Sequence, residues 1–212
     1  MGVGIRRAGE SDRDFVVGLL DEAFMDDPVS CWVFPGEEYR RARHAGLMGA
    51  FTDATLADGY IDLAEDGGAV ALWMDVPDEP HPDEAGAVAG GADASGVEAD
   101  GPAQVRAVVD PDNERVEQIA RLTEAAHPVG RAHVYLWMIG VKPDRQGEGL
   151  GTALMAPVLR RCDSEGLPAY LEASNARSRA LYERLGFVFT GSAIDLPDGT
   201  SLWPMWREPQ AG

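Results

Sequence analysis

The chain is short of basic residues. Lysine and arginine together number 18 against 36 aspartates and glutamates, which gives a formal net charge of −18 over 212 residues. Proteins that bind nucleic acid neutralise phosphates with basic side chains, so this balance argues against nucleic-acid binding. As the general cause of the acidity we favour a solubilising surface, although an acidic field would also attract a cationic amine.

Cysteines and long apolar runs are also scarce. Cys31 and Cys162 are too few for a disulfide framework, and we interpret both as reduced thiols of a cytoplasmic protein. Residues 1–14 carry no apolar stretch behind their arginines, which argues against a signal peptide. No stretch is long enough to span a bilayer, so we expect no membrane association. The four histidines have no ligand spacing, and we predict no metal.

The length suits a single domain, residues 1–212, with a full hydrophobic core. Within it, residues 81–102 are dominated by Pro, Gly, Ala, Asp and Glu without periodicity, which predicts a mobile acidic loop. Before that loop, apolar spacing predicts a helix that begins near Ser11, a second over residues 37–58, and a hairpin of residues 60–63 and 69–74. After it, the spacing predicts a helix over residues 113–126.

Residues 133–189 read as strand, glycine turn, helix, strand, helix, strand. The run HVYLWMIGV has strand length, and residues 152–162 carry apolar residues at helical spacing. A turn of glycines between a strand and a helix presents several backbone N–H groups to one anion, and a pyrophosphate suits such a turn. The spacing matches neither the Walker loop nor the GxGxxG dinucleotide turn. A final hairpin around Pro197, Asp198 and Gly199 closes the chain.

Two motifs in this segment resemble those of the GCN5-related N-acetyltransferase (GNAT) family. Gln146, Gly149 and Gly151 match the Q/R-x-x-G-x-G/A pattern of its acyl-CoA turn. Asn175 and the later run LYERLGF match its second signature. The run LEASNARSRALYERLGF and the strand AVALW are similar, more loosely, to the puromycin N-acetyltransferase-like members of the family.

The resemblance implies a fold and a cofactor. The fold is of the α/β (α+β) class, a mixed, mostly antiparallel twisted sheet that is split at the central strand, with helices on both faces. Acetyl-CoA would bind in the split, with the freed strand backbone on the pantetheine arm and the glycine turn on the pyrophosphate. The implied contacts are Met138, Ile139, Gly140, Val141, Gln146, Gly147, Glu148, Gly149, Leu150, Gly151, Thr152, Asn175 and Tyr182. Asn175 is equally an ordinary helix N-cap, and both roles are compatible.

The resemblance also implies catalytic groups. The family places the phenol of Tyr182 near the sulfur of CoA, where it can protonate the leaving thiolate; the alternative is amphipathic core packing. Glu172 matches a glutamate of the puromycin-acetylating relatives and is the candidate base, while a salt-bridged strand residue is the alternative. His133 is a candidate relay or an ordinary strand-end histidine. Arg145 is either a phosphate contact or a solvated charge.

For the acceptor, residues 25–35 form an aromatic, proline-flanked segment that is either a buried loop or the lining of a pocket. We predict that Trp32, Phe34 and Trp73, together with Glu172, contact the substrate. The predicted function is direct acetyl transfer from acetyl-CoA to a primary amine of a small molecule, of the antibiotic or aminonucleoside class by the looser resemblance. A protein N-terminal or lysine acetyltransferase and a catalytically silent CoA-binding protein stay as alternatives, as do monomer and homodimer.

Overall fold

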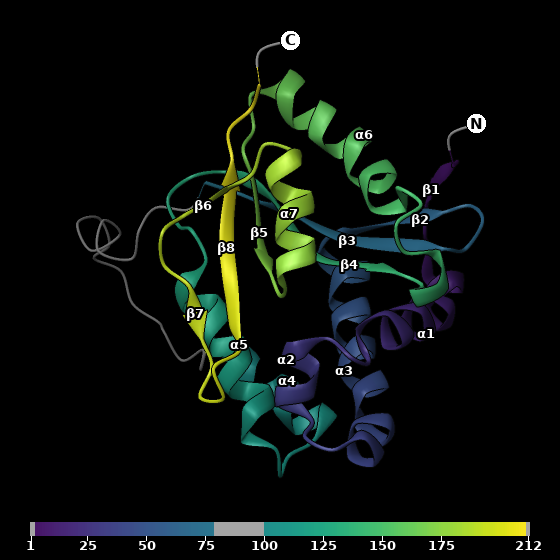
Figure 1. Cartoon of the computed structure of the whole chain (residues 1–212), viewed down its shortest axis with the longest axis vertical. Coiled ribbons are helices and arrows are strands. Elements are labelled where there is room, and N and C mark those ends of the chain that lie inside the picture. Colours follow the sequence, from purple (N-terminus) through teal and green to yellow (C-terminus); the bar gives the residue numbers. More distant parts are fainter. Residues whose placement is uncertain (1–2, 79–99, 211–212) are drawn as a thin grey trace, which may run out of the picture.

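The computed structural model describes residues 3–78 and 100–210 (Figure 1). Within them one mixed sheet has eight strands, in the order β1-β2-β3-β4-β5-β8-β6, with β7 paired to β8. The strands are β1 (Ile5–Arg7), β2 (Tyr60–Ala64), β3 (Ala69–Val76), β4 (His133–Val141), β5 (Ala169–Ala173), β6 (Val188–Phe189), β7 (Ile194–Asp195) and β8 (Ser201–Arg207). Every pair is antiparallel except β4 with β5, which confirms the predicted mixed, mostly antiparallel sheet.

Helices cover both faces of the sheet (Figure 1). They are α1 (Arg13–Phe24), α2 (Pro28–Val33), α3 (Glu37–Asp58), α4 (Gly101–Val109), α5 (Glu114–Ala126), α6 (Leu150–Glu165) and α7 (Ala176–Arg184), with short 3-10 turns at Glu10–Asp12 and Pro143–Arg145. Helices α6 and α7 pack on one face, and α1 to α5 pack on the other. This arrangement follows from the strands, whose apolar residues alternate between the two cores.

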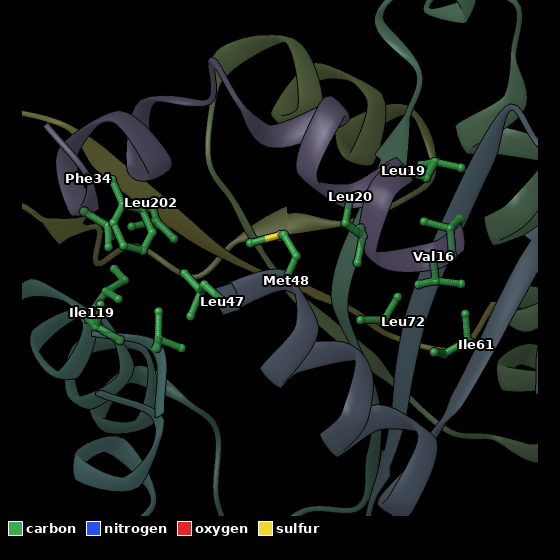
Figure 2. Close-up of a cluster of buried hydrophobic side chains, with 14 of the residues drawn as sticks. Val16, Leu19, Leu20, Phe34, Leu47, Met48, Ile61, Leu72, Ile119 and Leu202 are labelled. Atoms are coloured by element: carbon green, nitrogen blue, oxygen red, sulfur yellow. The ribbon is translucent and has the colours of Figure 1, made fainter. Parts of the chain in front are cut away.

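Strand β3 illustrates the alternation. Val70 and Leu72 point into the core under α1 and α3, whereas Ala71 and Trp73 point toward α6. Figure 2 shows the first core, in which side chains of α1 lie against Leu72 and neighbouring strand residues. Since both faces are buried, β3 reads as a continuous apolar run rather than as an alternating one.

Two sequence expectations need correction. Residues 25–35 are not a loop, because Pro28–Val33 form helix α2, whose first helical position tolerates proline and whose N-cap Asp27 accepts a hydrogen bond from Val29 N at 3.0 Å. The acidic loop predicted over residues 81–102 does not extend to residue 102. Asp100 caps α4, and Gly101 and Pro102 begin it, while residues 81–99 lie outside the described residues.

Candidate functional site

The site is built around the place where β4 and β5 separate. Within the described residues these strands pair only at Val134 with Ala169 and at Tyr135 with Tyr170. On the other side of β4, the ladder to β3 shifts register, so that Leu72 pairs with Met138 and Trp73 with Leu136. The extra residue, Trp137, makes a β-bulge, which bends a strand and increases its twist. Beyond Tyr135 no described residue of β4 pairs with β5, and the sheet is split at its central strand as predicted.

The predicted pantetheine contacts form the far end of β4. Met138 and Ile139 are partly buried, and Gly140 is buried where helix α1 crosses the strand. A Cβ on Gly140 would lie 3.1 Å from Ala23 Cβ and 3.2 Å from Leu20 Cδ2, so the close approach of α1 accounts for the glycine. Backbone groups of β4 that face the split are the ones that β5 does not reach.

The predicted pyrophosphate turn lies directly after this strand end. Gly149 is the N-cap of α6 with φ 85° and ψ 6°, a left-handed conformation that other residues adopt at a cost, and no side chain caps the helix. The N–H groups of the first turn, from Leu150 to Thr152, therefore have no partner within the helix and lie at its positive end. Nothing lies within 4 Å of a Cβ placed on Gly149, so the position opens to solvent. The turn suits an anion.

Charged groups surround the turn. Arg145 pairs with Glu148 at 2.7 Å and with Asp66 at 3.1 Å, so its charge is balanced and it ties the turn to the β2–β3 hairpin. Arg177, in the first turn of α7, instead donates to Gln146 Oε1 at 2.6 Å. Sequence reasoning missed Arg177, whose only signal was its place two residues after Asn175. It brings a guanidinium to the predicted phosphate site.

Glu172 lies on β5 just beyond the last β4–β5 pair. Its Oε2 accepts a hydrogen bond from the Tyr135 phenol at 2.8 Å, and its Oε1 is buried and has no partner among the described residues. Burial raises the pKa of Glu172 to about 7, against the opposing effect of the Tyr135 and Tyr170 phenols. A carboxyl with this pKa can exchange a proton near neutral pH.

Tyr182 is buried in α7, with its ring 6.1 Å from that of Phe187 in an edge-on arrangement. Burial, with a smaller effect from the charge of Asp27, raises the pKa of this phenol, which keeps its proton at neutral pH. A protonated phenol is a hydrogen-bond donor. The packing role and the predicted acid role are compatible in this geometry.

Asp27 joins the start of α2 to the end of β5 and was not singled out by the sequence as a site residue. Its Oδ2 accepts hydrogen bonds from Ser174 Oγ at 2.6 Å and from Asn175 Nδ2 at 3.4 Å. Asn175 also caps α7, since its side chain accepts from Ser178 N at 2.9 Å. The cap role predicted for Asn175 is therefore confirmed. Asp27 was missed because its partners lie about 150 residues away in the chain, a separation that appears only in the fold.

The aromatic residues predicted to contact the acceptor lie in the hydrophobic core, and their contact with the acceptor stays a prediction. Trp32 is 4% exposed, and Phe34 and Trp73 are 0% exposed. Phe34 packs edge-on against Tyr39 and His44, and Figure 2 shows it as part of the first core. Aromatic residues near a loop and in the interior carry the same sequence signal, because both sites favour large apolar rings.

His133, the candidate relay, is buried. Its Nδ1 donates to Arg131 O at 2.8 Å, and its Nε2 lies 3.1 Å from His127 Nε2.

The other sequence predictions concern metals, disulfides and membrane helices. Residues 3–78 and 100–210 contain no cluster of three His, Cys, Asp or Glu side chains placed to hold a metal. Cys31 and Cys162 are free thiols. No helix in the described ranges has both the length and the hydropathy that a membrane crossing requires.

The family follows from comparison with known proteins. The sequence model of the acetyltransferase (GNAT) family matches residues 73–187, which is more than half of the chain and contains the split and the glycine turn. The chain belongs to the GNAT family of acetyltransferases. Members of the family use acetyl-CoA and act on amines of small molecules or peptides.

Individual relatives share only part of their length with this chain. An uncharacterised N-acetyltransferase of Schizosaccharomyces pombe is 41% identical over 78 residues, 36% of this chain and 32% of that protein. The mycothiol acetyltransferase of Streptomyces coelicolor is 46% identical over 56 residues, 25% of this chain and 18% of that protein. The chain therefore spans about a third or less of these relatives.

Solved structures match over the whole chain. A Corynebacterium glutamicum protein, described as histone acetyltransferase HPA2 and related acetyltransferase, has a TM-score of 0.66 and 26% identity over 100% of this chain and 99% of that one. Arylalkylamine N-acetyltransferase 2 of Aedes aegypti has a TM-score of 0.65 and 14% identity over 98% and 99%. The second likeness is one of fold alone.

Proposed function

We propose that this protein transfers an acetyl group from acetyl-CoA to a primary amine of a small molecule, by direct attack of the amine on the thioester. The observation that carries the proposal is the split between β4 and β5, which has an anion-binding turn at one end and a carboxyl with a free oxygen at its apex. Direct attack needs these two elements and a proton donor, and no nucleophilic side chain.

The residues of the split fit acetyl-CoA. The pyrophosphate would accept hydrogen bonds from the turn around Gly149 and the first turn of α6, with the guanidinium of Arg177 beside it. The backbone of Met138 to Val141 would contact the pantetheine arm. When bound, acetyl-CoA supplies an acyl carbon that is activated by its thioester.

Proton transfer would fall to two side chains. An aliphatic ammonium must lose a proton before it can attack, and Glu172 Oε1 is the free acceptor at the apex of the split. The sulfur leaves as a thiolate, which the Tyr182 phenol can protonate because that phenol keeps its proton at neutral pH. As the C–N bond forms and the C–S bond breaks, the nitrogen loses a second proton, which passes through solvent to the Tyr182 phenolate. Glu172 then returns the first proton to solvent, so one proton is released for each acetyl group transferred.

For the acceptor, a small amine is supported by the position of Glu172, two residues beyond the last pair that holds β4 and β5 together. The antibiotic or aminonucleoside class rests on the looser sequence resemblance alone. Peptide amines are the second candidate. The full-length likeness to the Corynebacterium glutamicum protein favours it, and a charge of −18 would attract basic peptides.

The test is release of free thiol from acetyl-CoA with a panel of amines. The panel holds puromycin, aminoglycosides, polyamines, amino acids, a neutral N-terminal peptide and a lysine-rich peptide. We expect turnover of a small amine, and loss of that turnover in Glu172→Gln without loss of acetyl-CoA affinity. Turnover of peptides alone would favour the second candidate. Acetyl-CoA binding without thiol release from any amine would favour a silent CoA-binding protein.

A further inference from the structure

One hydrogen bond joins the two strands where the sheet divides. Tyr135 of β4 and Tyr170 of β5 are partners in the last pair of the parallel ladder, and Glu172 is two residues further along β5 on the same face. The Tyr135 phenol reaches diagonally across the gap and donates to Glu172 Oε2 at 2.8 Å. Beyond this bond the strands are separate, so Tyr135 bridges them at the apex of the split.

This bond leaves the two carboxylate oxygens unequal. Oε2 is held by the phenol, and Oε1 is shielded from solvent with no hydrogen-bond partner among the described residues. A buried polar atom without a partner is costly, and it persists where a ligand or a reacting group completes it. Since Tyr135 fixes the carboxylate plane through Oε2, Oε1 is the oxygen that is available.

The groups around the pair are uncharged near neutral pH. Burial and the neighbouring Glu172 raise the pKa of Tyr135, so this phenol remains a donor. The phenol of Tyr170 donates to Ala126 O at 3.3 Å and is also near enough to Glu172 to lower its pKa. The rings of His127 and His133 pack against Tyr170, and burial lowers the pKa of both imidazoles, of His127 to about 4.

No basic side chain is among the groups that shift the pKa of Glu172. Its ionised form is therefore stabilised by the neighbouring phenols and not by an ion pair. Of the two phenols, only that of Tyr135 meets the geometry of a hydrogen bond to the carboxylate, since Tyr170 is directed to a backbone carbonyl.

We propose that Tyr135 is a positioning residue for the acetyl transfer: by donating to Oε2 it orients Glu172 so that Oε1 accepts the proton of the acceptor ammonium. The proton moves from the ammonium nitrogen to Oε1, and Tyr135 keeps its own proton throughout. The inference rests on the proposed function, in which Glu172 is the base.

The substitution Tyr135→Phe removes one oxygen atom and keeps the ring. Without the phenol, the carboxylate of Glu172 loses a donor, and its pKa rises by about one unit, since a hydrogen bond to a charged group is of that magnitude. Activity that needs ionised Glu172 is lost as pH falls through this pKa. The acid limb of kcat/KM for the amine therefore moves to higher pH by about one unit, with roughly a fivefold loss at pH 7.

The experiment compares pH–rate profiles of the wild type, Tyr135→Phe and Tyr39→Phe. Tyr39 is the matched control, because its phenol donates to the carboxylate of Asp110 at 2.7 Å, on α3 and away from the split. We expect an upward shift of the acid limb in Tyr135→Phe and none in Tyr39→Phe. A Tyr135→Phe profile that is lower but has the same acid limb would overturn the proposal, because it would indicate a purely structural role.

A second measurement does not depend on turnover. Infrared titration of the Glu172 carboxyl, identified by its loss in Glu172→Gln, reports its protonation directly. We expect the titration midpoint in Tyr135→Phe to rise by the same amount as the acid limb. If the wild type turns over no amine, the proposed function fails while this titration still tests Tyr135. An unchanged midpoint would overturn the inference and leave the proposed function standing.

Discussion

At the scale of single residues, burial decides the chemistry of this site. Glu172 and Tyr182 both have a raised pKa because water is excluded, yet the result differs between them. The carboxyl is brought to about 7, where it can accept a proton, and the phenol moves further from neutrality, where it can only donate one. Two groups whose environments separate their protonation states in this way suit the acid and base roles that we propose for them.

Tyr182→Phe tests the donor role. We expect kcat to fall by about a hundredfold, because general acid catalysis contributes on that scale, while KM for acetyl-CoA changes little. Packing against Phe187 survives, since the ring is kept. Tyr60→Phe is the control, because its phenol accepts a hydrogen bond from Arg161 at 2.8 Å on β2, a strand that pairs with β1 and β3 and not with the strands of the split. Steady-state kinetics of both variants give the comparison, and an unchanged kcat in Tyr182→Phe would remove the phenol from the mechanism.

At the scale of elements, helix α6 has left-handed glycines at both ends. Gly149 is its N-cap and Gly166 its C-cap, with φ 85° and 69°, and a Cβ on either would meet nothing within 4 Å. Both positions thus require a left-handed backbone conformation, and only Gly149 lies at the predicted phosphate turn. A substitution at Gly166 is therefore a matched control for the same substitution at Gly149.

Gly149→Val and Gly166→Val separate backbone strain from ligand binding. We expect both to lower stability by about 1–2 kcal/mol, the usual penalty of a left-handed conformation. Only Gly149→Val should weaken acetyl-CoA binding, by at least about tenfold, because its side chain enters the space of the phosphates. Calorimetric titration with acetyl-CoA measures the affinity. Equal affinities in the two variants would contradict a phosphate site at this turn.

The elements also show what a sequence can predict. The helix predicted over residues 37–58 is α3 (Glu37–Asp58), and the strand predicted over residues 133–141 is β4, because both depend on local periodicity. Helix α2 was missed because Pro28 was interpreted as a break, although proline is tolerated at the first helical position. Motif spacing predicted the glycine turn, and the resemblance to the puromycin-acetylating relatives pointed to Glu172.

What the sequence could not predict depends on contacts between distant segments. Asp27 meets Ser174, and Arg177 meets Gln146, only because the sheet order brings their elements together. The bond between Tyr135 and Glu172 likewise requires the register of β4 on β5. The burial of Trp73 depends on α6 covering that face.

At the scale of the whole molecule, the chain is strongly anionic. A net charge of −18 destabilises a compact state through repulsion between like charges. Surface ion pairs, such as that of Arg13 with Asp53, oppose this repulsion locally, but exposed pairs contribute little each. Repulsion between like charges therefore lowers stability by more than the surface ion pairs raise it.

Added salt should stabilise the protein. Between about 0.01 M and 0.1 M ionic strength the screening length falls from about 30 Å to about 10 Å, which weakens long-range repulsion more than contact pairs. We expect the midpoint of thermal unfolding to rise over this range at pH 7, with sucrose at matched osmolality as the uncharged control. A midpoint that falls with salt would indicate that the ion pairs outweigh the repulsion.

The two residue pairs between β4 and β5 have a thermodynamic consequence. Strands β1 to β4 form one half of the sheet and β5, β8 and β6 the other, and each half carries part of the proposed site. A ligand that bonds to both halves acts as a missing strand between them. Folding and binding are then linked equilibria, and the protein's resistance to unfolding rises with the logarithm of the free acetyl-CoA concentration once this exceeds Kd. The lifetime of the chain would thus follow the supply of its own co-substrate.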